Sequence, residues 1–378
     1  MIDVAALFPD TYEASRQRFR SQLERLRARW PQARLHSRAL EADENLTTDW
    51  FDAPPARATE RLLIVTTGEH GIEGTIGAGI LQLIVDEFLD RLNPQHTGLL
   101  LLHVINPWGM CNHRRTNAAN VDLNRNFVRS PSDLDPTLNP DYAHLDRFLN
   151  PARPLQGLAL ARPGFLAGLG GHLMRMGPKT FQAVTLQGQY RNPRGLHFGG
   201  TAIQEETRLL MDLYRQLPAP YGHVLHLDMH TGYGPQDQMT LVNSSLEPRA
   251  SPDLVRLFDY PRVAKATLAE FYPIRGDMID YMYRMFQDEF PRTRLYATAF
   301  EFGTLGDSLP ALLRGLRTMI WETQVHQFGT RDTRLRQIVQ REFQALFAPS
   351  NAHWRRKAIA DARQALEGIL RAEGFLPG

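Results

Sequence analysis

A histidine and a glutamate stand three residues apart directly after an apolar stretch of the chain. His70 and Glu73 follow the segment RLLIVTTG, which begins at Arg61, so both side chains can face one point at the end of a buried strand. Zinc binds imidazole nitrogen and carboxylate oxygen, and a catalytic zinc site uses three protein ligands and leaves one position open for water. This pair therefore predicts part of a catalytic zinc site.

A third candidate ligand, His230, follows a second apolar segment, for which a strand over His223–Met229 is predicted. Alternate residues of a strand share one face, so His226, Asp228 and His230 point to the same side. We expect His230 to bind the metal at the mouth of the site and Asp228 to orient a neighbouring imidazole. His226 is expected to be a buried structural histidine.

The segments that carry these residues alternate between strand and helix patterns. Strands are predicted over Arg61–Thr67, Gly98–Ile105, Gln238–Asn243 and Leu295–Phe302, and a helix over Thr75–Leu92 lies between the first two. A strand, helix, strand order is typical of an α/β fold with a parallel sheet. Ligands bind outside the carboxyl ends of such strands, where both candidate clusters fall.

The chain is expected to form one catalytic domain with additions. Residues 1–57 are predicted to be a helical extension packed on the core, and residues 58–330 to be the catalytic domain. The Pro-, Gly- and Leu-rich stretch 128–200 sustains no single period and is predicted to be an insertion. Residues 331–378 are expected to add C-terminal helices to the same domain.

Composition excludes several classes of function. The 378 residues include 43 Lys and Arg against 41 Asp and Glu, and a net charge of +2 is too small for nonspecific nucleic-acid binding. The longest apolar runs are too short or too charged to span a bilayer. Cys111 is the only cysteine, so no intrachain disulfide can form, and we expect a cytoplasmic location.

Several motifs together resemble the zinc metallocarboxypeptidases, within the carboxypeptidase A-like superfamily and in an uncharacterised branch of bacterial type. The string NVDLNRNF, from Asn120 to Phe127, is the most specific of them. The others are NPWG from Asn106, RRTN from Arg114, HGIEG from His70, DMHTG from Asp228 and AFEFGT from Ala299. Their order matches that of the family over residues 61–321. The resemblance implies a three-layer α/β/α fold with a central mixed, mostly parallel sheet.

The resemblance also implies roles for individual residues. Asn124 and Arg125 match the pair that binds the terminal carboxylate of a substrate, for which a planar guanidinium is suited. Either Arg114 or Arg115 matches the arginine that polarises the scissile carbonyl. Glu301 matches the glutamate that takes a proton from the attacking water and returns it to the leaving amine.

A shorter match, YPIRGDMID, starts at Tyr272. It is similar to the segment of the family that carries a mobile tyrosine and a specificity residue. The resemblance then implies that Tyr272 covers the substrate and that Ile279 lines a pocket for apolar side chains. A plain junction between a loop and a helix, with Ile279 in the core, explains the same residues.

Three functions stay open on the sequence. The first is a zinc metallocarboxypeptidase that cleaves a peptide at its free carboxyl end, with no covalent intermediate, since a G-x-S-x-G motif is absent. The second is an N-acyl amino acid deacylase, because aspartoacylase and succinylglutamate desuccinylase resemble the same metal core more distantly. The third is a noncatalytic binding protein that keeps the fold. The sequence does not give the substrate, the role of the 128–200 insertion or the oligomeric state.

Overall fold

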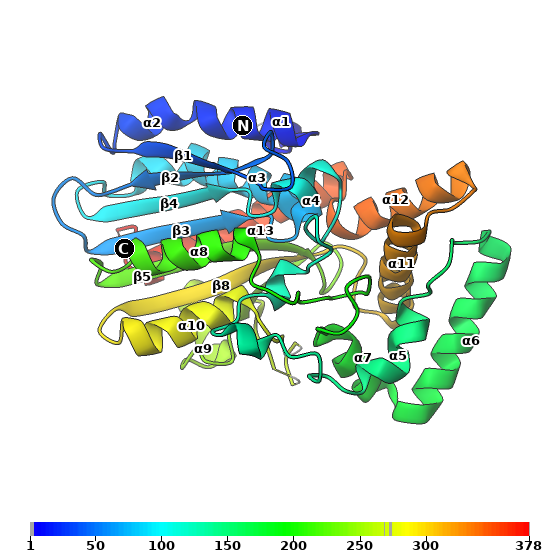
Figure 1. Ribbon diagram of the computed structural model, residues 1–378. Coiled ribbons are helices and arrows are strands. Elements are labelled where there is room, and N and C mark those ends of the chain that lie inside the picture. Colours follow the sequence, from blue (N-terminus) through cyan, green and yellow to red (C-terminus); the bar gives the residue numbers. More distant parts are fainter. Residues whose placement is uncertain (1–3, 268, 272–273, 378) are drawn as a thin grey trace.

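The computed structural model describes residues 4–267, 269–271 and 274–377, and within these residues the centre of the fold is an eight-stranded mixed sheet (Figure 1). The strand order is β1-β2-β4-β3-β5-β8-β6-β7. The four central strands β4, β3, β5 and β8 are parallel, and the antiparallel strands β2 and β6 flank them. The strands are β1 (Arg34–Ala39), β2 (Thr47–Ala53), β3 (Arg61–Thr67), β4 (Thr97–His103), β5 (His223–Gly232), β6 (Met239–Asn243), β7 (Val263–Lys265) and β8 (Arg294–Gly303).

Helices cover both faces of this sheet, so its central strands are buried on both sides. In β3 every residue after Arg61 is buried, as expected for a continuous apolar run in a parallel sheet. One face packs against α1 (Tyr12–Ser21), α2 (Leu23–Arg27), α3 (Gly74–Leu83), α9 (Ser251–Phe258) and α13 (Ala352–Ala372). The other face packs against α8 (Glu205–Gln216) and α10 (Met278–Glu289). The predicted three-layer α/β/α fold is confirmed.

Five further helices pack together beside one end of the sheet and are called the side lobe (Figure 1). They are α5 (Tyr142–Leu149), α6 (Leu158–Met176), α7 (Pro178–Leu186), α11 (Leu309–Phe328) and α12 (Thr333–Phe347). The first three come from the 128–200 stretch that the sequence analysis treats as an insertion. Their apolar side chains share one core with those of α11 and α12. The side lobe thus joins two stretches that lie far apart in the chain.

The structure differs from the expectation at the N-terminus. Residues 1–57 contain the expected helices α1 and α2, but also β1 and β2, which extend the central sheet beyond β4. None of the residues of β1 is buried. The sequence of β2 alternates less clearly between apolar and polar residues, because it contains Asp beside aromatic residues. An edge strand with so few buried side chains shows no clear apolar period in the sequence.

The pairing of parallel strands fixes which residues meet at the carboxyl edge of the sheet. In the register of β5 with β8, His230 lies opposite Glu301. In the register of β3 with β5, Thr67 lies opposite Met229, so the chain leaves β3 beside His230. Because residues opposite each other in neighbouring strands point to the same face, the strand register alone places Glu301 next to a candidate metal ligand.

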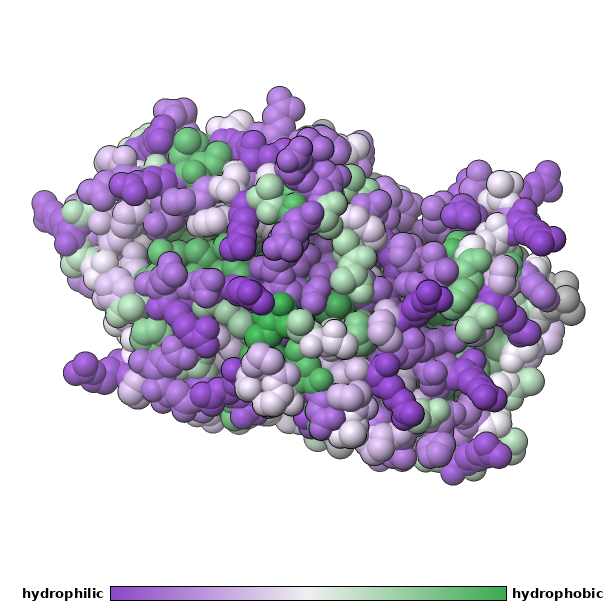
Figure 2. Space-filling view, viewed as in Figure 1, coloured by the Kyte–Doolittle hydropathy of each residue, from purple (hydrophilic) through white to green (hydrophobic). Residues whose placement is uncertain are grey.

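The surface is mostly hydrophilic on the face drawn in Figure 2, with apolar residues gathered in a small area near its middle. None of the described helices combines the length and the apolar character that a bilayer crossing requires.

Candidate metal centre

The backbone after β3 turns sharply before it reaches the first two candidate ligands. Gly68 has φ +65°, and a Cβ atom there would lie 2.0 Å from a valine methyl carbon. The chain then forms the short 3-10 helix η2 (Gly71–Glu73), and a Cβ atom on Gly71 would lie 2.2 Å from a backbone carbonyl carbon of α4 (Pro107–Cys111). Only glycine fits these two positions. The turn leaves His70 and Glu73 buried on the same side.

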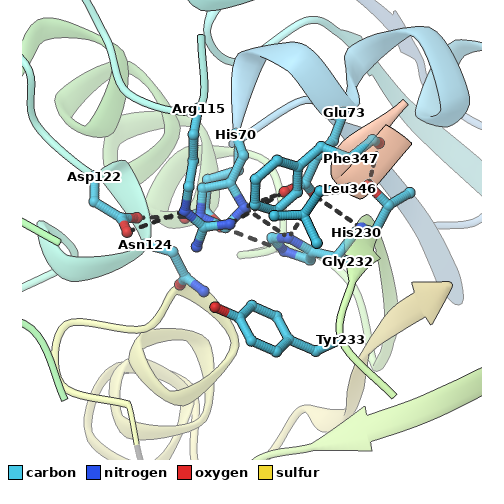
Figure 3. Close-up of polar contacts among 12 residues, drawn as sticks. His70, Glu73, Arg115, Asp122, Asn124, His230, Gly232, Tyr233, Leu346 and Phe347 are labelled. Atoms are coloured by element: carbon cyan, nitrogen blue, oxygen red, sulfur yellow. Dashed lines mark hydrogen bonds and ion pairs between the residues drawn. The ribbon is translucent and has the colours of Figure 1, made fainter. Parts of the chain in front are cut away.

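The three candidate ligands converge on one point (Figure 3). Nδ1 of His70 lies 3.0 Å from Oε1 of Glu73 and 3.2 Å from Nδ1 of His230. Nδ1 of His230 lies 3.4 Å from the other carboxylate oxygen of Glu73. The two imidazoles therefore turn the same ring nitrogen toward one carboxylate, although 160 residues of chain separate them.

These separations fit a tetrahedral metal ion. Zinc–nitrogen bonds of about 2.0–2.1 Å in a tetrahedral shell place neighbouring ligand atoms about 3.3–3.4 Å apart. The two Nδ1 atoms lie 3.2 Å apart, and each lies 3.0 or 3.4 Å from one of the two carboxylate oxygens of Glu73. Two imidazole nitrogens and one carboxylate leave a fourth position for water or substrate.

A carboxylate holds the far side of each imidazole ring. Nε2 of His70 lies 3.1 Å from Oδ1 of Asp122, and Nε2 of His230 lies 2.5 Å from Oδ2 of Asp228. Metal-binding histidines usually donate their second ring N–H to such a partner, which fixes the orientation of the ring. Asp228 lies where the sequence analysis expects it, whereas this contact of Asp122, which belongs to the NVDLNRNF string, was not anticipated.

Negative charge is concentrated around this point. Five carboxylates lie within the cluster and are at most 8% exposed. They are Glu69, Glu73, Asp122, Asp228 and Glu301. Buried carboxylates are strongly unfavourable unless cations or hydrogen bonds compensate them. A divalent cation between the imidazoles would place positive charge among these carboxylates, which is a second reason that the donor set fits a metal.

Arg115 supplies positive charge at the edge of the cluster. Its guanidinium donates hydrogen bonds to Glu73 through Nη1 at 3.2 Å and to Asp122 through Nε at 3.3 Å, and it lies over the ring of Phe347. Arg114 points elsewhere, toward Glu322 on α11. The structure therefore brings Arg115, and not Arg114, to the candidate ligands.

Glu301 opens into the same pocket as the ligands, on the side of β8. We call this space the metal pocket; its lining includes His70, His230, Arg115, Asn124, Tyr233 and Glu301. The backbone N–H of Tyr233 donates to Oε1 of Glu301 at 3.0 Å. Burial raises the pKa of Glu301, His230 lowers it and the negative charge of Glu73 raises it, and together these effects bring the pKa to about 7. A carboxylate with a pKa near neutrality can both accept and return a proton.

The charges of the ligands depend on one another. Burial alone would raise the pKa of Glu73, but His70 and His230 lower it to about 2. Burial lowers the pKa of His230, but Asp228 and the neighbouring glutamates hold it well above its ordinary value. Burial and Arg115 lower the pKa of His70, and its two carboxylate neighbours nevertheless hold it above the ordinary value. The cluster therefore favours positive charge between its carboxylates.

Glu69 is a further carboxylate that could reach a metal, and the sequence analysis did not select it. One ligand atom from each of Glu69, His70 and His230 lies within 4.8 Å of the other two. However, Oε2 of Glu69 lies 3.3 Å from Nε2 of His230, on the ring edge that Asp228 occupies. Glu73 faces the Nδ1 atoms of both imidazoles, so Glu73 fits the shared point better. A carboxylate directly before His70 at a strand end was a signal that could have identified Glu69.

Asn124 and Arg125 lie at different depths. Asn124 lines the metal pocket, and its Oδ1 accepts a hydrogen bond from the backbone N–H of Met278 at 3.0 Å. Arg125 is 1% exposed, and its guanidinium donates to the backbone carbonyls of Asn124 and Leu186, both at 2.7 Å. The structure thus places Asn124 in the pocket and the charge of Arg125 directly behind it.

Of the two residues singled out in the YPIRGDMID segment, the structure describes one and not the other. Ile279 is 4% exposed at the start of α10 and lines the metal pocket, where it also packs against Tyr283. Tyr272 lies outside the described residues. His226, which was expected to be a buried structural histidine, shares a hydrogen bond of 2.9 Å with Oγ1 of Thr66. It does not line the metal pocket.

Two residues near the site were missed in the sequence. His197, at the end of the 128–200 stretch, places Nδ1 3.0 Å from Oδ2 of Asp122. Tyr233 directs its side chain toward Asn124 (Figure 3). Tyr233 follows the DMHTG motif directly, which was a usable signal. His197 carries no local signal, because a distant segment brings it to Asp122.

Comparisons with known proteins give one family and a set of structures. A family model described as "Protein of unknown function (DUF2817)" matches residues 8–361. None of the curated proteins compared with the chain matches it.

Three solved structures illustrate the similarity in fold. Carboxypeptidase A from Helicoverpa armigera is 13% identical, with 88% of this chain and 73% of that chain covered and a TM-score of 0.44. Bovine thrombin-activatable fibrinolysis inhibitor, in complex with tick carboxypeptidase inhibitor, is 12% identical, with 82% and 94% covered and a TM-score of 0.44. A succinylglutamate desuccinylase from Silicibacter is 12% identical, with 78% and 66% covered and a TM-score of 0.37.

We expect the chain to bind one Zn²⁺, and the ring partner Asp228 to contribute to affinity. Replacing His230 with Ala should abolish stoichiometric binding, and Asp228→Asn should weaken it about 10- to 100-fold, because the imidazole loses its orienting carboxylate. Competition titrations with a chelator of known affinity measure both. His144→Ala, at an exposed position, is the control and should bind normally. Equal affinity in the His230 and His144 variants would contradict this assignment.

Metal binding should release protons at neutral pH. Since neighbouring carboxylates raise the pKa values of His70 and His230 in the metal-free protein, these rings hold their protons to higher pH than a free histidine does and must lose them to bind zinc. Affinity should therefore rise with pH until the pH exceeds both pKa values. Calorimetry in buffers with different ionisation enthalpies counts the protons. An affinity that is equal at pH 6 and pH 8 would exclude imidazole ligands with raised pKa values.

Proposed function

The chain belongs to the DUF2817 family, and from its candidate metal centre we propose that it is a zinc-dependent hydrolase that cleaves an amide bond next to a free carboxylate. In the form we favour it is a metallocarboxypeptidase. His70, Glu73 and His230 hold one zinc ion, and Glu301 is the general base. The proposal is supported most by one observation: two imidazole Nδ1 atoms and one carboxylate converge within 3.0–3.4 Å, beside a second carboxylate that opens into the same pocket.

The chemistry follows from this arrangement. Zinc supplies a Lewis acid that lowers the pKa of water and polarises a carbonyl. Glu301, whose pKa is raised to about 7 mainly by burial, takes the proton from the attacking water and returns it to the leaving amine. The water thus adds to the carbonyl carbon, the C–N bond breaks, and a carboxylic acid and an amine are released. The backbone N–H of Tyr233 keeps the carboxylate of Glu301 in place.

Arg115 is the proposed partner of the carbonyl oxygen. Its guanidinium lies beside Glu73 and lines the metal pocket, where it can donate hydrogen bonds to the negative charge that develops on that oxygen. Asn124 is proposed to bind the carboxylate of the substrate, with the charge of Arg125 behind it. Ile279 would line the adjacent surface, and Tyr272 is proposed to cover the substrate, as the sequence resemblance implies.

An N-acyl amino acid deacylase is the second candidate. It needs the same centre and the same carboxylate recognition, and one observation favours it: only about 30 Å³ is free beside the candidate ligands, which leaves no room there for several residues of a peptide. A noncatalytic binding protein would be expected to lack a ligand or the base, whereas all four residues are present. We place the enzyme in the cytoplasm because its single cysteine excludes an intrachain disulfide.

Replacing Glu301 with Gln should leave zinc stoichiometry intact and lower turnover at least about 100-fold, because the amide cannot accept the proton. Metal analysis and release of C-terminal amino acids from a mixed pool of peptides and N-acyl amino acids, with and without chelator, measure both. Glu342→Gln, on α12, is the matched control and should keep full activity. Near-normal turnover of the Glu301 variant means that the base lies elsewhere.

The two adjacent arginines should differ in effect. Arg115→Lys removes the planar donor beside Glu73, so kcat should fall about 10²- to 10³-fold while zinc binding persists. Arg114→Lys changes contacts with Glu322, Thr116 and Asn120, none of which is a candidate ligand, and kcat should stay within about threefold. Steady-state kinetics on the best substrate from the pool decide this. Equal losses in both variants would show that position 115 has no special role at the carbonyl.

A further inference from the structure

A second and much larger hollow adjoins the metal pocket and is called the apolar chamber. It is open to solvent on one side and has a volume of about 600 Å³, within the range of small-molecule binding sites. The side-lobe helices α6, α7 and α11 form much of its wall. Its apolar lining includes Leu169, Leu173, Phe181, Leu312, Leu316 and Met319. No step of the proposed reaction uses this space.

The apolar chamber also exposes apolar side chains. Leu309 and Leu312, on α11, line it and are 66% and 40% exposed. Leucine side chains that line a hollow beside a reactive centre mark a binding surface for an apolar group. These leucines belong to the side lobe, whereas Thr240 and Val263, which also line the chamber, belong to strands β6 and β7. The lobe and the sheet therefore form the binding space together.

The metal pocket is too small to contain a whole substrate. Its volume of about 30 Å³ is room for about two or three water molecules. The attacking water, the reacting carbonyl and the carboxylate near Asn124 would fill it. The rest of a bound substrate must therefore extend out of the metal pocket.

The apolar chamber borders the metal pocket at two shared residues. Tyr233 and Phe271 line both the metal pocket and the apolar chamber, and the N–H of Tyr233 binds the carboxylate of Glu301. Tyr233 and Phe271 therefore lie between the two spaces, and a group that extends past them from the metal pocket reaches the chamber. Asn124 and Ile279 line the metal pocket but not the chamber. If Asn124 binds the carboxylate of the leaving amino acid, the acyl side of the substrate is the part that extends into the chamber.

We propose that the substrate carries an apolar group on the acyl side of its scissile amide and that the apolar chamber binds this group. The inference rests on the proposed function, because it takes the direction of the substrate from the carboxylate site. The walls offer extensive apolar surface, so affinity should grow with apolar area on the acyl side. A fatty acyl chain and a run of apolar amino acids both supply such a group.

Gly315 allows the chamber to be filled without disturbing the centre. It lines the apolar chamber on α11, and a Cβ atom there would lie 3.8 Å from Cδ1 of Leu346, an ordinary contact. A leucine at this position would therefore fit at its base and extend into the chamber. Gly170, on α6, is the matched control, because a Cβ atom there has no neighbour within 4 Å among the described residues, and Gly170 does not line the chamber.

The test is binding of N-acetyl-, N-octanoyl- and N-dodecanoyl-L-alanine to the zinc-loaded Glu301→Gln protein by calorimetry. A binding measurement in this background does not depend on turnover. The octanoyl compound should bind at least about 50-fold more tightly than the acetyl compound, since each added methylene contributes about two- to fourfold. Adding Gly315→Leu should lower the affinity for the two long compounds at least tenfold and the affinity for the acetyl compound less than twofold. Adding Gly170→Leu should change none of them.

Affinity that is independent of chain length, or a Gly315→Leu effect that is equal for all three compounds, would overturn the proposal. N-acetyl-Leu-Leu-alanine serves as the peptide arm: if it binds more tightly than the dodecanoyl compound, the apolar group is a peptide, and if not, it is an acyl chain. Turnover by the unsubstituted protein is measured separately. Length-dependent binding without any hydrolysis would contradict the proposed function alone, whereas hydrolysis without length dependence would contradict the apolar chamber alone.

Discussion

The concentration of buried negative charge at the carboxyl edge of the sheet is the constraint on which the rest of the site depends. Five carboxylates are almost completely buried there. Removing such charges from water is strongly unfavourable unless positive charge is close. Arg115 and the two imidazoles provide part of that charge. A divalent ion at the shared point of the Nδ1 atoms would replace the protons on the imidazoles and keep positive charge there, and the same ion would activate water. The stability of the cluster and the chemistry at the site thus both require positive charge at this point.

Much of the site was predictable because it lies in the most regular part of the fold. The strand ending at Thr67 is observed with the predicted bounds, and the strands near His230 and Glu301 differ only in their ends. Continuous apolar runs give a strong signal for buried parallel strands. Since parallel strands end at one edge, residues that follow them in the sequence meet in space. The register of β5 with β8 then places Glu301 beside His230.

The parts that could not be predicted depend on contacts between distant segments or on weak periods. β1 has no buried face to show an alternation, and Pro163 and several glycines obscure the helical period of α6. His197 meets Asp122 only because the chain returns after α7. The sequence could not distinguish Arg114 from Arg115, because the two adjacent arginines have the same local sequence. Only the structure shows that their side chains point in different directions. The apolar chamber joins α6 and α7 to α11 and has no continuous motif.

The most direct measurement is anomalous X-ray diffraction at the zinc edge from crystals of the protein loaded with one equivalent of Zn²⁺. A single peak bonded at about 2.0–2.1 Å to Nδ1 of His70, Nδ1 of His230 and a carboxylate oxygen of Glu73, with Glu301 facing its open side, is the result expected here. A peak bonded through Nε2 of His230 and Glu69, or zinc found only at the molecular surface, would contradict the metal centre.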